Sequence, residues 1–191
     1  MSVILVTPPQ TEPVTLTEAR AHLRIDDTAE DSLIGALIAA ARVHVENATR
    51  RVLIEQHWKL TLDAWPRSGQ IDVPIAPVIA IDAVSLRGVD GVARPLPLAA
   101  CYVDTASTPA RLRLIEPASL PPLAPVNAVA VELTAGYGPS AVSVPQPLRE
   151  AIMLLVARWY EGRDGLGKTI DAGIPDQVRD LIAPYRQLRV A

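Results

Sequence analysis

The sequence predicts an α+β fold, in which a mainly helical core carries an inserted small antiparallel β-sheet or open barrel. Near both ends of the chain, apolar residues recur every three to four positions, as they do on one face of a helix. Between about residues 55 and 135 the period falls to two and prolines interrupt the pattern often. No helix-length period separates the strand candidates, which argues against a βαβ arrangement. At 191 residues, the chain is expected to form a single domain over residues 1–191.

The first helix is predicted at residues 16–24. Thr15 and Glu18 have the spacing of a capping box, in which each side chain accepts a hydrogen bond from the backbone N–H of the other residue. Val14 precedes the cap, where an apolar residue can act as a hydrophobic staple. These signals fix where the helix begins.

The second helix is predicted at residues 28–49. Acidic residues gather at its start, where the positive end of the helix dipole favours negative charge; they are Asp26, Asp27, Glu30 and Asp31. A calcium site is the alternative interpretation, but the glycine and the closing glutamate of a calcium loop are missing, so helix capping is favoured. The apolar face predicted for this helix consists of Leu33, Ile34, Leu37, Ile38, Ala41, Val45 and Ala48.

The strand-rich insertion holds five strand candidates, at residues 57–63, 79–86, 102–103, 111–115 and 128–133. In the first of them apolar residues alternate with polar ones, which predicts one face exposed to water. The prolines between the candidates keep the strands short, because proline has no N–H to donate to a neighbouring strand.

Helical periodicity returns after residue 145. One helix is predicted at 147–161, with an apolar stripe made of Leu148, Ile152, Leu155, Val156 and Trp159. A short helix is predicted at 175–183, and Pro184 ends or kinks it. The tail, residues 185–191, mixes apolar and basic side chains, and a tail of this kind usually needs a partner to become ordered.

Composition excludes several classes of protein. The chain has 18 Lys and Arg against 21 Asp and Glu, a formal net charge of -3, which argues against a protein that grips nucleic acid through its phosphates. A monomeric DNA-binding factor is therefore only a minor alternative. The apolar stretches fall short of the ~18 residues that a membrane span needs, and no basic segment precedes the first one, so neither a membrane anchor nor a secretion signal is expected.

The single cysteine, Cys101, excludes an internal disulfide and a cysteine-based zinc site. This usage fits a reducing cytoplasm. The thiol is expected to lie half-buried on a strand.

One motif matches a nucleotide-binding pattern letter for letter. Residues 162–169 read G-x-x-x-x-G-K-[ST], the pattern of a phosphate-binding loop. Such a loop leaves a buried strand and enters a long helix, whereas a predicted helix precedes this segment and residues 170–175 cannot continue one. A soluble nucleotide- or ligand-binding domain that uses the Gly162–Thr169 loop is kept as the alternative function.

No catalytic or metal-binding constellation is found. His22, His44 and His57 lie on different predicted elements without clustered carboxylates, so no metal site and no cofactor are expected. No serine or cysteine stands in a recognisable nucleophile setting. The sequence therefore predicts a protein that is not an enzyme.

Four stretches, taken in order and spacing, carry a resemblance that covers nearly the whole chain. They read VTLTEARAHLR (14–24), LIGALIAAAR (33–42) after its acidic start, LTAGYG (133–138), and LREAIMLLVARWYE (148–161) with the distal LIAPYR (181–186). In this pattern the chain resembles the head-tail connector, or adaptor, proteins of long-tailed bacteriophages and gene transfer agents.

The resemblance implies a structural subunit that forms a ring, typically of twelve copies, beneath the portal at one capsid vertex. Such a ring joins the capsid to the next connector, a stopper or a tail-terminator protein, and DNA passes through its lumen without specific binding. It also implies a place in the neck of a virion or phage-like particle assembled in the bacterial cytoplasm. By analogy with the family, the residues that face the portal are expected to be Tyr185, Arg186, Leu188, Arg189 and Val190.

Overall fold

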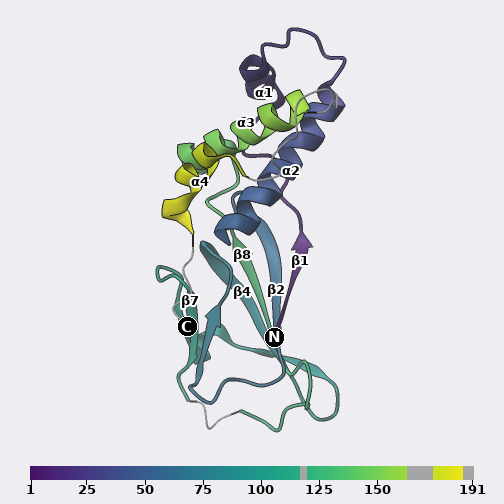
Figure 1. Cartoon of the computed structure of the whole chain (residues 1–191). Helices are drawn as coiled ribbons and strands as arrows, with labels where there is room; N and C mark the ends of the chain where they lie inside the picture. Colours follow the sequence, from purple (N-terminus) through teal and green to yellow (C-terminus); the bar gives the residue numbers. More distant parts are fainter. Residues whose placement is uncertain (117–119, 163–173, 187–191) are drawn as a thin grey trace. The chain divides into compact units, whose positions relative to one another are not determined.

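The computed structural model describes residues 1–116, 120–162 and 174–186, and the chain divides into two compact units (Figure 1). The strand unit consists of Met1–Pro9 and Glu55–Gly138, and the helical unit of Gln10–Ile54 and Pro139–Ala191. The strand unit thus contains the segment predicted as a strand-rich insertion together with the first nine residues.

The strand unit contains two antiparallel sheets, and neither closes into a barrel. The five-stranded sheet has the order β1-β2-β8-β4-β5, with β1 at Ser2–Thr7, β2 at Gln56–Leu62, β8 at Val129–Ala135, β4 at Val78–Arg87 and β5 at Ala93–Leu96. The three-stranded sheet has the order β3-β7-β6, with β3 at Gln70–Val73, β7 at Ala110–Leu114 and β6 at Cys101–Asp104. A 3-10 turn, η1 at Leu98–Ala100, leads into β6.

Alternation along the strands gives each sheet a buried face, and these faces form the core of the strand unit. Side chains buried in the five-stranded sheet include Leu60, Val84, Val129, Val131 and Leu133, and those in the three-stranded sheet include Ile71, Val73, Leu112 and Leu114. Lys59 and Glu132 lie opposite each other on the other, water-facing side of the larger sheet. The predicted strand with one wet face is therefore confirmed in β2.

The helical unit contains four α-helices and two 3-10 turns among the described residues. Their bounds are Leu16–Leu23 (α1), Asp31–Thr49 (α2), Gln146–Glu161 (α3), Asp176–Ile182 (α4), Ala141–Ser143 (η3) and Ala183–Tyr185 (η5). Helix α3 packs along both α2 and α4, and α1 contacts α2 and α3. The largest side chains buried between the helices are Ile34, Ile38, Leu148, Ile152, Leu155 and Ile182.

The capping box at α1 is present as predicted. The Thr15 hydroxyl accepts a bond from the Glu18 N–H at 3.2 Å, and the Glu18 carboxylate accepts one from the Thr15 N–H at 2.9 Å. At α2 the acidic cluster acts differently from the expectation: Glu30 occupies the N-cap but makes no side-chain cap bond. Asp27 accepts a bond from the Ala29 N–H, one turn before the helix.

Strands make up a larger share of this fold than the sequence patterns predicted. The predicted class, α+β with antiparallel strands, is confirmed, but the mainly helical character is not, because strands cover almost as many residues as α-helices do. The sequence patterns missed three strands, β1, β3 and β5. β1 is an apolar run without alternation, and the other two are only four residues long and contain Asp72 or Pro95.

Within the residues that the structure describes, none of the helices has the length and hydropathy required to cross a membrane.

Candidate interaction surfaces

One polar cluster of the strand unit is a short chain of hydrogen bonds on the water-facing side of the five-stranded sheet. The Nδ1 atom of His57 lies 3.0 Å from the Thr134 hydroxyl, and that hydroxyl donates to Asp82 at 2.8 Å. An activated nucleophile would have to give its proton to the histidine, whereas the Thr134 proton points to the carboxylate. The cluster therefore links three strands and does not form a catalytic arrangement.

The other two histidines lie in the helical unit, on two different helices, as predicted. His44 on α2 meets Trp159 on α3 edge to face, with ring centroids 5.9 Å apart, and His22 is exposed on α1. Across residues 1–116, 120–162 and 174–186, no group of three or more His, Cys, Asp or Glu side chains is placed to hold a metal ion.

The phosphate-loop motif follows a helix, as predicted, and not a strand. Helix α3 ends at Glu161, and Gly162 forms its C-cap. Residues 163–169, which make up the rest of the motif, lie outside the described residues. The element that a phosphate-binding loop requires before it is a buried strand, so the described part of the motif does not support nucleotide binding.

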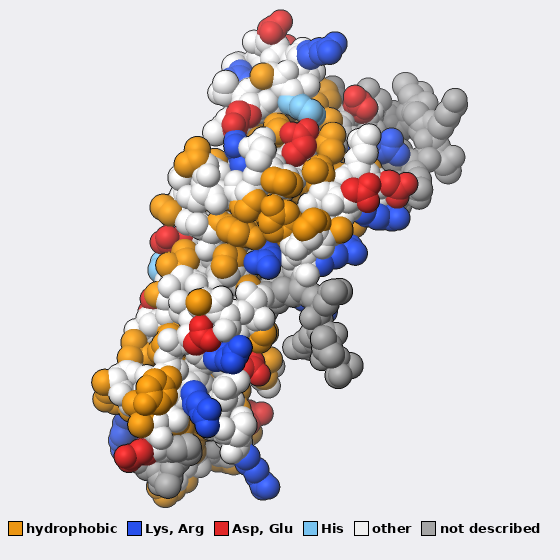
Figure 2. All heavy atoms as spheres, turned by 90° about the vertical axis from the view of Figure 1, so that its left-hand side faces the viewer, with side chains coloured by type: hydrophobic (Ala, Val, Ile, Leu, Met, Phe, Trp, Pro, Cys, Tyr) orange, Lys and Arg blue, Asp and Glu red, His pale blue; other side chains and the backbone are white. Residues whose placement is uncertain are grey.

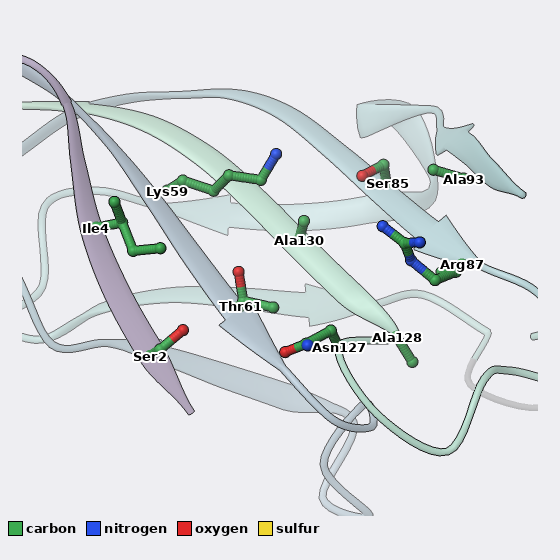
Figure 3. Close-up of a pocket in the computed structure, with 10 residues that line it drawn as sticks. All are labelled: Ser2, Ile4, Lys59, Thr61, Ser85, Arg87, Ala93, Asn127, Ala128 and Ala130. Carbon is green, nitrogen blue, oxygen red and sulfur yellow. The ribbon is translucent and has the colours of Figure 1, made fainter. Parts of the chain in front are cut away.

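A hollow of about 380 Å³ lies on the open face of the five-stranded sheet (Figure 3). Strand register aligns a row of side chains across this face: Ser2, Thr61, Ala130, Ser85 and Pro95. Figure 3 shows Lys59 and Arg87 projecting over it from β2 and β4. Lys59 is paired with Glu132 at 3.1 Å, and Arg87 donates to the Gly91 carbonyl at 3.4 Å, so the hollow does not present two free cations to an anion.

The N-terminal strand β1 forms one edge of this sheet and is the most exposed apolar strand. Five of its six residues are exposed, and the exposed large apolar side chains are those of Val3, Ile4, Leu5 and Val6. β2 is its only partner strand among the described residues. Sequence patterns did not identify this surface. An uncharged apolar run that ends before Pro8 and Pro9 is the feature that could have predicted an edge strand here.

Cys101 lies at the start of β6 and is free, as the sequence required. Its side chain is buried more completely than the half-buried state that was predicted. Burial raises the pKa of the thiol above its ordinary value, so a smaller fraction of it is the reactive thiolate at neutral pH.

Arg42 joins two segments of the helical unit. Its guanidinium donates to Glu12 at 2.7 Å and to Glu46 at 2.9 Å, and Glu46 also accepts from the Leu53 N–H at 2.9 Å. Burial lowers the pKa of Arg42, but the hydrogen bond from Arg42 to Glu12 and the charges of both carboxylates more than offset this, so the pKa lies above its ordinary value. The charge of Arg42 therefore stabilises the unit internally and is not offered to a partner.

The C-terminal segment is tied to the helical unit just before its last residues. The Nε atom of Arg51 donates to the Tyr185 carbonyl at 2.7 Å. The Tyr185 side chain is half-buried, and Arg186 is exposed. Leu188, Arg189 and Val190, which were also predicted to face a partner, lie outside the described residues.

Hydrophobic side chains also reach the surface of the helical unit. Figure 2 shows them gathered in a patch on one face of its helices, with acidic and basic side chains beside them. Among the described residues of this unit, the exposed large apolar ones are Leu16, Leu33, Val43 and Val142. A structural protein that assembles with others is expected to carry such patches.

The sequence of the chain matches a known protein family over part of its length. Residues 13–88 match the family model described as phage gp6-like head-tail connector protein. No curated protein matches the chain in sequence.

Several solved structures are similar over the full length. A chain from the "Neck of empty GTA particle computed with C6 symmetry" is 29% identical, with a TM-score of 0.84. A chain from the "Virion of native gene transfer agent (GTA) particle" is 31% identical, also with a TM-score of 0.84. A chain from the "Neck of native GTA particle computed with C12 symmetry" is 31% identical, with a TM-score of 0.75. Each similarity covers 100% of this chain and 98% of the other.

Proposed function

The chain belongs to the phage gp6-like head-tail connector family, and on that premise we propose that twelve copies of it form a ring beneath the portal of a phage or gene transfer agent particle. There the ring joins the capsid to the tail and forms part of the conduit for DNA. The observation that carries this proposal is the full-length similarity, at 31% identity, to a chain of a neck described with C12 symmetry. The protein then resides in the particle neck, after assembly in the bacterial cytoplasm.

A ring of this kind requires two different complementary faces on each subunit, because each copy contacts one neighbour through one face and the other neighbour through the other. The two compact units act together in this proposal as one connector subunit. A stable contact between neighbours buries about 800 Å² on each partner. The exposed apolar residues of both units supply surface for such contacts.

The net charge of -3 suits a conduit for DNA. A lumen that repels phosphate does not retain the duplex as it passes. Specific DNA binding is therefore not part of the proposed function.

The proposed partner above the ring is the portal, and below it the next connector, a stopper or a tail-terminator protein. The C-terminal segment is proposed to reach the portal through Tyr185, Arg186, Leu188, Arg189 and Val190. The bond from Arg51 to the Tyr185 carbonyl supports this assignment, because it fixes the position of Tyr185, the first residue of the segment.

Portal co-purification tests the assignment. A chain that ends at Arg186 keeps the Tyr185 carbonyl and its bond to Arg51, so we expect it to fold as the full chain does. It should lose about tenfold or more of its affinity for portal protein, the change that corresponds to about 1.4 kcal/mol of contact energy. Arg186→Ala should weaken binding as well, whereas Arg67→Ala, which changes another exposed arginine, in the strand unit, should not. Undiminished portal binding by the shortened chain would contradict the role of the tail and leave the ring proposal standing.

A further inference from the structure

Strand β1 has an unpaired edge. In the order β1-β2-β8-β4-β5 it lies outermost and pairs with β2 alone among the described strands. Every second N–H and C=O of an edge strand points away from its one partner. Another strand satisfies such a row of groups better than a helix or a side chain does.

The side chains of β1 make this edge unusual. Val3, Ile4, Leu5 and Val6 are 36, 56, 41 and 59% exposed. The first three alternate between the two faces of the strand, and the register with β2 shifts between Leu5 and Thr7. The strand carries no charge and no proline. Soluble proteins protect their edge strands with charged residues and prolines, because an apolar edge strand without them pairs with other chains. An edge of this kind is suited to pairing with a strand of another chain.

The other sheet edges differ in how they are protected. β5 contains Arg94 and Pro95, and β3 contains the exposed Asp72, so both carry the features that discourage pairing. β6 differs, because its one charged residue, Asp104, lies at its end and accepts hydrogen bonds from Ser107. Its first three residues are uncharged, and two of them, Tyr102 and Val103, are 67 and 41% exposed.

We propose that β1 of one copy pairs edge to edge with β6 of the neighbouring copy in the ring, an inference that rests on the proposed function. A cyclic ring needs two different strands for this contact, because pairing of β1 with another β1 would close a two-fold dimer. β1 and β6 meet this condition, since they belong to different sheets. In Figure 1, β1 and β7, the central strand of the three-stranded sheet, are drawn on different sides of the strand unit.

A second copy is also the occupant that fits the chemistry of both edges. The paired segments, Ser2–Thr7 and Cys101–Val103, contain no charged side chain, so they offer nothing to DNA phosphates. Main-chain bonds would give affinity, and the apolar side chains on both faces would be buried against the neighbour. Contacts of this apolar type are typical of obligate assemblies of identical chains.

Disulfide cross-linking in assembled necks tests the pairing. In a Cys101→Ala background, each apolar position of β1 from Val3 to Val6 is changed to Cys and combined with Tyr102→Cys or Val103→Cys. Residues opposite each other on paired antiparallel strands have Cα atoms about 4.5 to 5.5 Å apart, a spacing that a disulfide spans. We expect at least one combination to give a ladder of covalent dimers, trimers and larger species after oxidation, and the corresponding single-cysteine chains to give none.

The other outcomes separate the alternatives. Covalent dimers from a β1 cysteine alone would overturn the proposal in favour of two-fold pairing of β1. Wild-type necks that contain a ring, with no cross-link in any combination, would overturn the strand pairing and leave the proposed function intact. Particles whose necks lack the wild-type chain would count against the proposed function itself.

A charge placed on β1 provides a second test that needs no cysteine. Ile4→Lys changes an exposed side chain, so the fold measured by circular dichroism should be retained, while incorporation into necks should fall by about tenfold or more. Val89→Lys is the matched control, because Val89 is 72% exposed in the same unit but lies outside the strands. Incorporation of the Ile4→Lys chain at the wild-type level would overturn the proposal.

Discussion

Glu18 shows how one residue connects segments that lie far apart in the sequence. Its carboxylate accepts bonds from the backbone N–H and the hydroxyl of Thr15 and from the Arg149 guanidinium, and Arg149 also donates to the Pro13 carbonyl at 2.9 Å. This clamp joins the start of α1 to α3. The capping box was predictable from the spacing of two residues, but the bond to Arg149 was not, because no local pattern pairs residues separated by 131 positions.

The clamp predicts a pH dependence of stability. The Thr15 backbone N–H, and after it the bond from Arg149, hold the pKa of Glu18 below its ordinary value of 4.5, against the opposing effect of burial. A carboxyl whose pKa is lower in the folded chain stabilises the fold above the unfolded pKa, and this contribution disappears as the pH falls through the folded value. The free energy of unfolding of the wild type should therefore exceed that of Glu18→Gln at about pH 6, and the difference should shrink by about pH 3. Urea unfolding of both chains measures it, and a difference that stays constant over this range would contradict the role of Glu18.

At the scale of elements, sequence periodicity located the helices and most of the strands. All four predicted helices are present, although α2 begins at Asp31 and not at residue 28. The five predicted strands correspond to β2, β4, β6, β7 and β8, with ends within two residues of those expected. The strands that were missed have two physical reasons. An edge strand such as β1 needs no alternation because neither of its faces is buried, whereas β3 and β5 combine a length of four residues with Asp72 or Pro95, residues that are rare in strands.

Helix α2 shows a second limit of periodicity. The sequence placed Leu33 and Ile34 on one apolar face, yet Leu33 is 39% exposed and Ile34 is fully buried. Neighbouring residues differ by about 100° around a helix, so a broad apolar stripe cannot identify which of its flanks faces the core. The same uncertainty applies to the interaction surfaces, whose apolar residues resemble core residues in the sequence.

This difference gives a matched pair of substitutions on one helix. Ile34→Ala should lower the free energy of unfolding by about 2 to 5 kcal/mol, because it removes buried methyl groups and leaves a cavity. Leu33→Ala should cost less than about 1 kcal/mol, since the side chain is partly in water already. Urea denaturation of the two variants measures both values. Equal losses of stability would mean that α2 is rotated relative to the orientation described.

At the scale of the whole molecule, the exposed apolar surface agrees with a subunit that assembles with other copies. Among the described residues, large apolar side chains remain exposed in both units. An isolated copy would expose these residues to water, and a closed ring would bury them. Resemblance to a family supplied the number of copies, because neither periodicity nor a single subunit specifies the rotation between neighbours.

The subunit number is the last prediction, and it is measured on the assembly. Necks released from particles should contain a ring of this chain with a mass about twelve times 20.5 kDa, as read by native mass spectrometry after the other neck proteins are identified. Portal protein should accompany the ring, because contacts that bind only the assembled form stabilise it by mass action. The isolated chain serves as the comparison, since a ring that forms only on the portal would leave it monomeric. A different copy number in the neck would refute the twelvefold ring, and complete absence of the chain from the neck would refute the connector function.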